Sequence, residues 1–198
     1  MESLFRTAFW VIFIGMILFQ LNFALRLRLA GEQKATDRKT IKREEWGFAV
    51  VRVIRSIALV VFLVLYAVDH PWLRSLSVPF PAWLRWMGVT LGVLSIVFYA
   101  WSRRTLGMEW SSFLQMRDKH RLVAAGPYAC IRHPIYLSMM GFLGGIALIT
   151  ANWVLIAFLG VSIVDLVIRI PKEEQMMIEE FGDEYKAYMQ KTGRLFPR

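Results

Sequence analysis

Five apolar runs constrain the fold of this chain more than any other feature of its sequence. They cover residues 4–25, 46–68, 84–101, 137–149 and 153–168. An α-helix rises about 1.5 Å per residue, so roughly twenty apolar residues cross the ~30 Å hydrocarbon core of a bilayer. A content of 57% hydrophobic residues in 198 is also more than an ordinary soluble domain carries. The pattern predicts an all-α polytopic membrane protein with about five transmembrane helices.

The basic residues predict how these helices are oriented. Lysine and arginine occur seven times between residues 26 and 43, and six times each in residues 103–132 and 169–198. The connector between the second and third runs has only Arg74. Because basic residues gather on the cytoplasmic side of a membrane, we expect the N-terminus outside and these three segments in the cytoplasm. The net charge of +9 then needs no nucleic acid partner.

Charged and small residues inside the runs predict contacts between helices. Arg52 and Arg55, near the start of the second run, must face protein, water or lipid head groups, because a charge at the bilayer centre is costly. Gly141 and Gly145 in the fourth run have the GxxxG spacing that lets a neighbouring helix approach closely. The same spacing also provides room for a ligand beside the helix, so both interpretations are kept.

A polar stretch rich in rings separates the third run from the fourth. Residues 120–136, HRLVAAGPYACIRHPIY, contain two histidines, two tyrosines and two arginines, and this concentration beside a membrane predicts chemistry. The structural alternatives are a helix-terminal role for His133 and interfacial anchoring by Tyr128 and Tyr136. Cys130 is the only cysteine of the chain, which excludes an internal disulfide and a metal site built from several cysteines.

The C-terminal tail is the second candidate stretch. Residues 169–197 read RIPKEEQMMIEEFGDEYKAYMQKTGRLFP, and Arg169 and Glu173 are four residues apart, within reach of an ion pair. Pro171 lacks a backbone N–H, so we expect the last membrane helix to kink or end there. We expect a cytoplasmic amphipathic helix to follow, because apolar residues recur at spacings of three and four. These residues are Ile178, Phe181, Tyr185 and Tyr188.

Together the two stretches resemble the isoprenylcysteine carboxyl methyltransferase family, and in particular its compact prokaryotic members. The resemblance rests on GPYACIRHPIY, an apolar hairpin and the tail, in this order, and extends over roughly residues 98 to 198, including LGMEWSSFLQ. It implies one membrane domain over residues 1–198, with cofactor-site motifs at 103–136 and 169–197. It also implies an S-adenosylmethionine-dependent methyltransferase of a prokaryotic cell membrane, with its active site facing the cytoplasm.

The resemblance further implies roles for individual residues. Those expected to contact S-adenosylmethionine are Gln115, His120, Leu122, Val123, Tyr128, His133, Pro134, Tyr136 and Glu173. Arg169 is expected to hold the carboxylate of the methyl acceptor, with Glu173 beside it in the catalytic site. Arg103 or Arg104 is expected to match a further functional arginine of the family. Whether Arg132 also takes part is left open by the sequence.

The chemistry of methyl transfer suits these residue types. The reaction is an in-line displacement at a sulfonium, so an enzyme gains chiefly by orienting the reactants and excluding water. A carboxylate acceptor is already ionised at neutral pH and needs no general base. It needs a fixed cation, and the planar fork of an arginine holds a carboxylate in a defined attitude. Tyrosine faces suit an adenine or a sulfonium, and an acidic side chain suits the ammonium group of the cofactor.

Other functions remain open from the sequence alone. The lipophilic acceptor, entering from the bilayer, can be a thiol or a phospholipid amine in place of a carboxylate. An NADPH-dependent membrane reductase is a second class, because sterol reductases have a similar RHP-type motif and tail, in chains that are generally larger. A non-catalytic membrane scaffold is a third, which the polar cluster near one interface argues against. We expect no metal and no nucleic acid in any of these functions.

Overall fold

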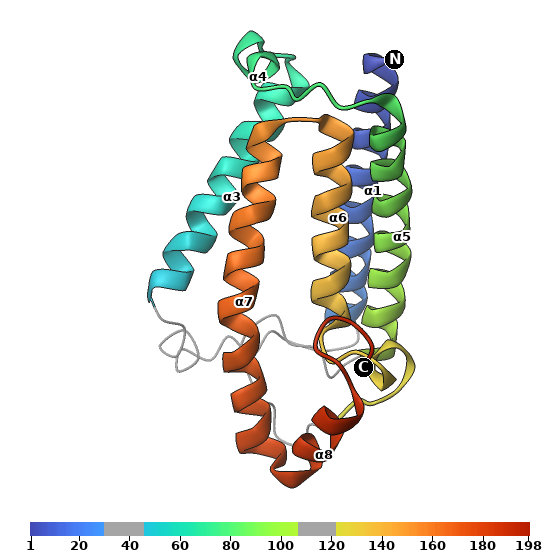
Figure 1. Cartoon of the computed structure of the whole chain (residues 1–198), viewed down its shortest axis with the longest axis vertical. Helices are drawn as coiled ribbons and strands as arrows, with labels where there is room; N and C mark the ends of the chain where they lie inside the picture. The colour runs from blue at the N-terminus through green and yellow to red at the C-terminus, as the bar shows by residue number, and fades with distance from the viewer. Residues whose placement is uncertain (30–45, 107–121) are drawn as a thin grey trace.

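The structure of the protein, a computed structural model, describes residues 1–29, 46–106 and 122–198. Every secondary-structure element assigned within these ranges is a helix, which confirms the predicted all-α class. The elements are α1 (Glu2–Leu29), α3 (Trp46–Ala67), α4 (Pro71–Ser75), α5 (Ala82–Leu106), the 3₁₀ helix η2 (Gly126–Ala129), α6 (Pro134–Thr150), α7 (Trp153–Phe181) and α8 (Asp183–Lys191). The N-terminus and α4 lie at one end of the long axis, and α8 and the C-terminus lie toward the other (Figure 1).

Within the described residues, three helices are long and apolar enough to cross a membrane. By length and composition these are α1, over Glu2–Arg26, α5 and α7. Two shorter apolar helices, Val53–Ala67 within α3 and Pro134–Thr150, coincide with the second and fourth predicted runs. The structure thus supports an integral membrane protein built from helices. Five crossings, and the orientation with the N-terminus outside, stay predictions.

The last membrane helix was predicted to kink or end at Pro171, and α7 does not end there. It continues to Phe181 and stops at Gly182, whose backbone φ of +56° favours glycine. A proline removes one backbone hydrogen bond, and the side chain of Arg169 bonds to that of Glu173 across this turn. A kink at Pro171 stays a prediction.

The predicted amphipathic helix is therefore wrong in its extent. Ile178 and Phe181 belong to α7, whereas Tyr185 and Tyr188 belong to the separate short helix α8, where both are buried. Gly182 separates the two pairs, so the four residues do not form one face of a single helix. The apolar residues keep helical spacing across Gly182 in the sequence, although the chain turns at this glycine and the helix ends there.

Helices α5 and α6 pack closely through small residues. A Cβ atom added to Gly88 would lie 2.8 Å from the carbonyl oxygen of Gly145, and one added to Gly145 would lie 2.8 Å from the backbone nitrogen of Gly92. A Cβ atom at Gly141 would collide with Ser95. The close helix approach predicted from the GxxxG spacing is confirmed, and α5 occupies the space beside these glycines.

A group of ion pairs closes the end of the bundle that carries α4. It consists of Glu2, Arg6, Asp69, Arg74 and Arg85, and we call it the α4-end cluster. Arg85 donates to both carboxylate oxygens of Glu2, at N–O distances of 2.5 and 3.0 Å, and its Nε donates to the carbonyl of Ile149 at 2.8 Å. Asp69 accepts from the other two arginines. The cluster joins the starts of α1 and α5 to the end of α6.

Helix α3 is joined to the bundle by an aromatic contact and an ion pair. Near its end, Tyr66 is buried against Phe9 of α1, with ring centroids 4.8 Å apart. Nearer its start, Arg55 pairs with Asp165 of α7 at an N–O distance of 2.6 Å. The prediction that the basic residues of this run face protein, water or head groups is therefore confirmed for Arg55. The side chain of Arg52 lies outside the described residues.

Candidate functional site

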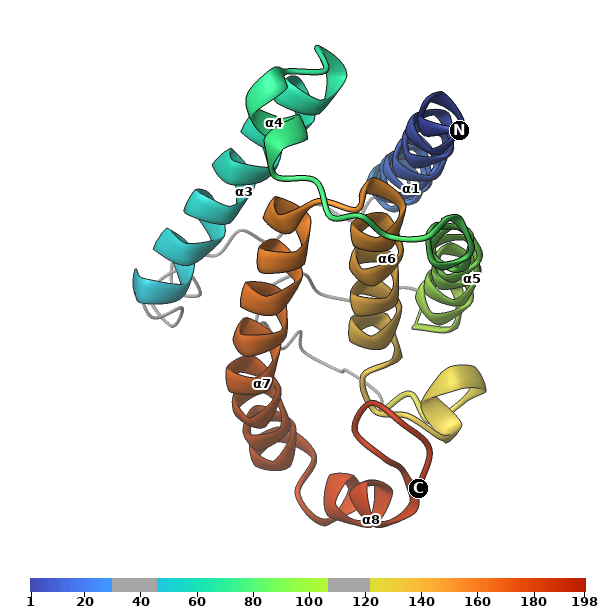
Figure 2. The same cartoon turned by 45° about the horizontal axis from the view of Figure 1, so that its top comes forward.

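The two predicted motifs meet at the end of the bundle that carries α8, which we call the α8 end. Ile131 and Gly193 form a parallel β-bridge. The N–H of Arg132 donates to the carbonyl of Gly193 at 2.9 Å, and the N–H of His133 donates to that of Arg194 at 3.0 Å. Figure 2 shows the segment before α6 beside the C-terminal segment. Backbone hydrogen bonds thus bring together residues that are about sixty positions apart.

Three predicted site residues form one hydrogen-bonded group. The phenol of Tyr136 donates to Glu173 Oε1 at 2.5 Å, and Arg169 Nε donates to the same oxygen at 2.8 Å. The predicted ion pair between Arg169 and Glu173 is confirmed. Tyr136 comes from the first turn of α6 and the other two from α7, so the group spans both motifs. It ties the RHP segment to the point where the apolar part of α7 ends.

His133 lies against this group. Its ring stacks on that of Tyr136, with centroids 5.6 Å apart and an interplanar angle of 19°. Its Nδ1 atom is 3.9 Å from Glu173 Oε2, and its Nε2 atom is 3.5 Å from Glu174 Oε1. Pro134 follows as the first residue of α6, where its missing N–H costs nothing and its fixed φ favours a helix start. The imidazole therefore faces two carboxylates and one phenol ring.

Glu174 is central to the α8 end, although the sequence analysis did not single it out. Its side chain is only 3% exposed. Arg132 Nε donates to Oε1 at 2.8 Å, and Arg194 Nε donates to Oε2 at 2.8 Å. Arg132 also donates to the carbonyls of Met189 and Thr192. One buried carboxylate thus holds α7, the segment before α6 and the C-terminal segment together.

The adjacent glutamates consequently have different surroundings. Glu174 is enclosed by two guanidinium groups, whereas the side chain of Glu173 is 19% exposed. The helical period indicates that the two glutamates point in different directions, because neighbouring residues are turned about 100° apart. The sequence alone did not show which of the two faces inward, because Arg132 and Arg194 are distant in the chain.

Tyr128 is held inside the protein. It lies in η2, is buried, and its carbonyl accepts a hydrogen bond of 2.6 Å from the phenol of Tyr188. Burial raises the pKa of Tyr128 above its ordinary value, and burial raises the pKa of Tyr188 to about 12. Both phenols are therefore protonated at neutral pH. Tyr128 is not exposed as an interfacial anchor would be, and Tyr188 fixes the backbone beside it.

The remaining predicted cofactor residues divide into two groups. Leu122 and Val123 are half-buried in the segment that leads into η2. Gln115 and His120 lie outside the described residues. The structure therefore brings Tyr128, His133, Pro134, Tyr136 and Glu173 to one end of the bundle, with Leu122 and Val123 a few residues before them in the chain.

The two arginines at the end of α5 differ from each other. Arg103 is buried, with its guanidinium 4.4 Å from the ring centroid of Phe23 and 5.7 Å from that of Tyr99. Arg104 is exposed. The buried side chain points into the bundle on the side of α1, and the exposed one points away. That one of the two, Arg103 or Arg104, is a functional arginine stays a prediction.

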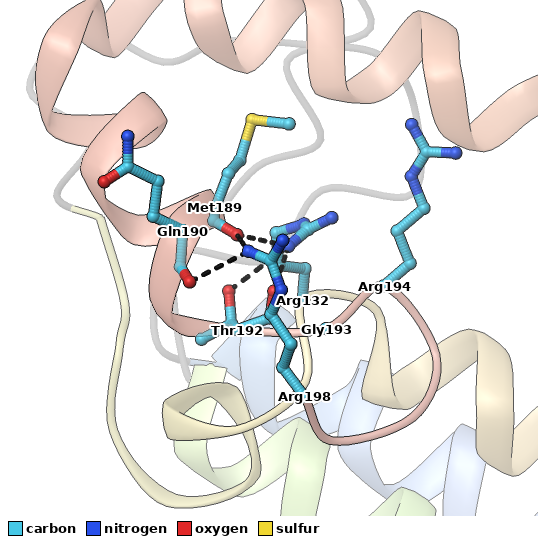
Figure 3. A pocket seen from close by; sticks show the side chains of 7 residues that line it. All are labelled: Arg132, Met189, Gln190, Thr192, Gly193, Arg194 and Arg198. Carbon is cyan, nitrogen blue, oxygen red and sulfur yellow. Dashed lines mark hydrogen bonds between the residues drawn. The ribbon is translucent and has the colours of Figure 1, made fainter.

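A cavity of about 490 Å³ lies beside the C-terminal segment (Figure 3). It is lined by Arg132, Met189, Gln190, Thr192, Gly193, Arg194 and Arg198. The guanidinium of Arg198 donates to the carbonyl of Gln190 at 2.9 Å, and that of Arg132 to the carbonyl of Met189 at 3.1 Å. These cations are thus engaged by carbonyls and by Glu174, and the cavity marks where the tail folds back on itself.

The α8 end can hold a cationic ligand and an aromatic one. Glu173 offers a carboxylate beside the stacked rings of His133 and Tyr136, and Arg169 provides a fixed cation at its edge. Across residues 1–29, 46–106 and 122–198, no group of three or more His, Cys, Asp or Glu side chains has the geometry to hold a metal ion. The arrangement suits the binding of charged organic groups.

Comparisons with known proteins give a family match and several similar chains. Residues 81–179 match the model of the isoprenylcysteine carboxyl methyltransferase (ICMT) family. A cobalt-zinc-cadmium resistance protein of Cupriavidus metallidurans is 27% identical over 118 residues, 59% of this chain and 52% of that one. The protein-S-isoprenylcysteine O-methyltransferase B of Arabidopsis thaliana is 25% identical over 185 residues, 91% of this chain and 88% of that one. The matched region thus spans about half of the first relative and most of the second.

A shorter match and a solved structure add to these. The methanethiol S-methyltransferase 1 of Bradyrhizobium diazoefficiens is 36% identical over 70 residues, 35% of this chain and 24% of that one. The structure of a eukaryotic intramembrane Ras methyltransferase, an isoprenylcysteine carboxyl methyltransferase, matches with a TM-score of 0.62 and 24% identity. It covers 96% of this chain and 67% of the other. At that identity the likeness shows the fold.

Proposed function

Because the chain belongs to the isoprenylcysteine carboxyl methyltransferase family, we propose that it is a membrane methyltransferase that uses S-adenosylmethionine. Its acceptor is lipophilic and carries a carboxylate of the isoprenylcysteine type. The reaction takes place at the cytoplasmic interface of the membrane, with the N-terminus on the opposite side. The family membership supports the reaction class, and the residues of the α8 end support the assignment of roles.

The observation that most supports this proposal is the sharing of Glu173 Oε1 by Tyr136 and Arg169. The three side chains come from the two motifs, and they meet where α7 passes from an apolar stretch into a charged one. A water-soluble cofactor and a lipophilic acceptor have to meet at such a boundary. Tyr136 is the last residue of the first motif and Arg169 is the first residue of the second. The group they form with Glu173 is therefore suited to contact both the cofactor and the acceptor.

The residues of the α8 end fit S-adenosylmethionine. This cofactor supplies a methyl group bonded to a positively charged sulfonium. We assign the partly exposed carboxylate of Glu173 to the ammonium group of the cofactor, since opposite charges attract strongly where water is scarce. The stacked rings of His133 and Tyr136 offer an aromatic surface of the kind that favours cations and flat bases. Residues assigned to the rest of the cofactor pocket are Gln115, His120, Leu122, Val123, Tyr128 and Pro134.

Arg169 is assigned to the acceptor. Its Nε atom is fixed by Glu173, so the guanidinium is held in one attitude at the membrane exit of α7. A planar, always protonated guanidinium is the side chain best suited to orient a carboxylate. Holding the acceptor in line with the methyl group is the main contribution an enzyme makes to such a displacement. The apolar tail of the acceptor stays in hydrocarbon meanwhile.

A thiol acceptor is the second candidate, because a similar chain is named methanethiol S-methyltransferase. The two acceptors differ in how turnover depends on pH. A carboxylate is ionised above about pH 5, whereas a thiol has a pKa of about 8.5. Turnover of a thiol should therefore rise between roughly pH 7 and 9, and turnover of a carboxylate should not change through ionisation of the acceptor.

Calorimetric titration of the purified protein with S-adenosylmethionine and with NADPH tests the proposal. We expect saturable binding of the first and none of the second. Tyr136→Ala and His133→Ala should weaken binding of the cofactor at least about tenfold, which is ~1.4 kcal/mol. His70→Ala, a histidine substitution next to α4 at the other end, is the matched control and should bind like the parent. Binding of NADPH alone would favour a reductase, and parental binding by both folded α8-end variants would disprove the site.

A further inference from the structure

Arg169 has a carboxylate on each side of it along one face of α7. Asp165 is four residues before it and Glu173 four residues after it. Residues four apart are neighbours on a helix surface, so the arginine can reach either one. Only a partner on the Glu173 side brings the guanidinium to Tyr136 and the candidate site. The choice between the two carboxylates therefore decides where Arg169 points.

The helix by itself favours the other choice. An acid placed four residues before a base forms a better pair than an acid placed four residues after it. Asp165 is also the only charged residue of the run 153–168. An unpaired carboxylate in such a stretch is costly, which strengthens its demand for a cation. An isolated α7 would be expected to turn Arg169 toward Asp165, away from the site.

Helix α3 removes this competition. Arg55 Nη1 lies 2.6 Å from Asp165 Oδ2, and both side chains are about 25% exposed. The guanidinium of Arg55 also lies over the ring of Phe158, two turns earlier in α7, at 5.6 Å from its centroid. Asp165 is thus bound by a cation from another helix. Arg169 bonds to Glu173 instead, through its Nε atom at 2.8 Å.

We propose that Arg55 is a positioning residue: by occupying Asp165 it keeps Arg169 on Glu173. Neither Arg55 nor Asp165 is among the residues assigned to the cofactor or the acceptor. The effect on turnover rests on the proposed function, but the direction of Arg169 does not. Helix α3 therefore contributes to the candidate site through Arg55 without reaching it.

The test uses Arg55→Gln, Asp165→Asn and the double variant. The reporter is the Nε–H resonance of Arg169 in ¹⁵N NMR spectra of the full chain, assigned by its absence from Arg169→Lys. In Arg55→Gln the free Asp165 should draw Arg169 away and shift this resonance. In the double variant no carboxylate competes, so the resonance should return to the parental position. Asp165→Asn alone should leave it unchanged.

Turnover should follow the same order. We expect kcat to be at least about tenfold lower in Arg55→Gln than in the parent, which corresponds to a rise of ~1.4 kcal/mol in the activation free energy. Both the double variant and Asp165→Asn should stay within about threefold of the parent, since each leaves Arg169 a single carboxylate. Cofactor affinity should fall less than kcat in Arg55→Gln. If Gln at this position prevents folding, Arg55→Met repeats the test with a side chain that suits a lipid-facing helix.

Two results would overturn the proposal. One is an unshifted Arg169 resonance in the folded Arg55 variants. The other is equal loss in Arg55→Gln, Asp165→Asn and the double variant, which is the behaviour of a tether between α3 and α7. A parent protein that neither binds S-adenosylmethionine nor methylates an acceptor would refute the proposed function instead, while the resonance would still decide the role of Arg55.

Discussion

The two ends of this bundle both carry ion pairs, yet they use them differently. In the α4-end cluster, Glu2 and Asp69 each bind arginine side chains, and Arg85 adds a bond to a helix-ending carbonyl. At the α8 end, two adjacent glutamates have different surroundings. Glu174 is enclosed by arginines, and Glu173 is partly exposed beside the stacked rings of His133 and Tyr136. Ion pairs alone therefore do not mark a site. What distinguishes the α8 end is a carboxylate next to the stacked rings of His133 and Tyr136.

The largest effect is expected from Glu174→Gln. Removing one partner of a buried ion pair costs about 3–5 kcal/mol, because a charge is left buried without compensation. Here two arginines, Arg132 and Arg194, would lose their carboxylate. The thermal unfolding midpoint should fall, the tail should be cleaved faster by protease, and cofactor binding should be lost with the fold of this end.

Glu180→Gln, an exposed glutamate two turns further along α7, is the matched control. It should unfold at the parental temperature and bind the cofactor normally. Parental stability of Glu174→Gln would show that the carboxylate does not hold the C-terminal segment.

An intermediate effect is expected from Tyr136→Phe. The substitution removes one hydrogen bond to a charged group, which is worth ~1.5–3 kcal/mol, and leaves the ring stacked on His133. Cofactor affinity should fall about tenfold or more, because Glu173 loses a donor that orients it, and the unfolding midpoint should fall less than in Glu174→Gln. Calorimetry and thermal unfolding on the same sample give both values. Tyr66→Phe, a buried tyrosine near the α4 end, should leave the affinity unchanged.

The smallest effect is expected at the α4-end cluster, from Glu2→Gln. The Glu2 side chain is 65% exposed and that of Arg85 is 10% exposed, and Arg85 keeps its bond to the carbonyl of Ile149, so the loss should be about 1 kcal/mol. The unfolding midpoint should fall slightly and cofactor affinity should not change. A loss of affinity comparable to that of Tyr136→Phe would contradict the separation of the two ends.

Much of this fold was predictable because its causes are local. The five apolar runs follow from composition along the chain, and the all-α class follows from them. The Arg169–Glu173 pair and the close approach at Gly141 and Gly145 follow from helical spacing. Each of these inferences needs residues within one helix, and helical geometry is the same in every protein.

The parts that could not be predicted depend on distant segments. Glu174 is important because Arg132 and Arg194 converge on it, and Asp165 because Arg55 reaches it from α3. Pro171 was expected to kink or end the helix, and α7 continues through it to Phe181. Spacing along one helix shows which residues share a face, but not which other segment covers that face.

The measurement that tests the central claim most directly compares Arg169→Lys with Glu173→Gln. Both substitutions alter the same ion pair, and both variants are assayed for turnover of a prenylated cysteine analogue and for affinity toward S-adenosylmethionine. Arg169→Lys keeps the charge but loses the planar fork, so turnover should fall about a hundredfold or more, ~2.7 kcal/mol, with near-parental cofactor affinity. Glu173→Gln should lose both. Normal turnover by Arg169→Lys, or equal loss of cofactor by the two variants, would show that the pair is structural and that its two members do not divide acceptor and cofactor between them.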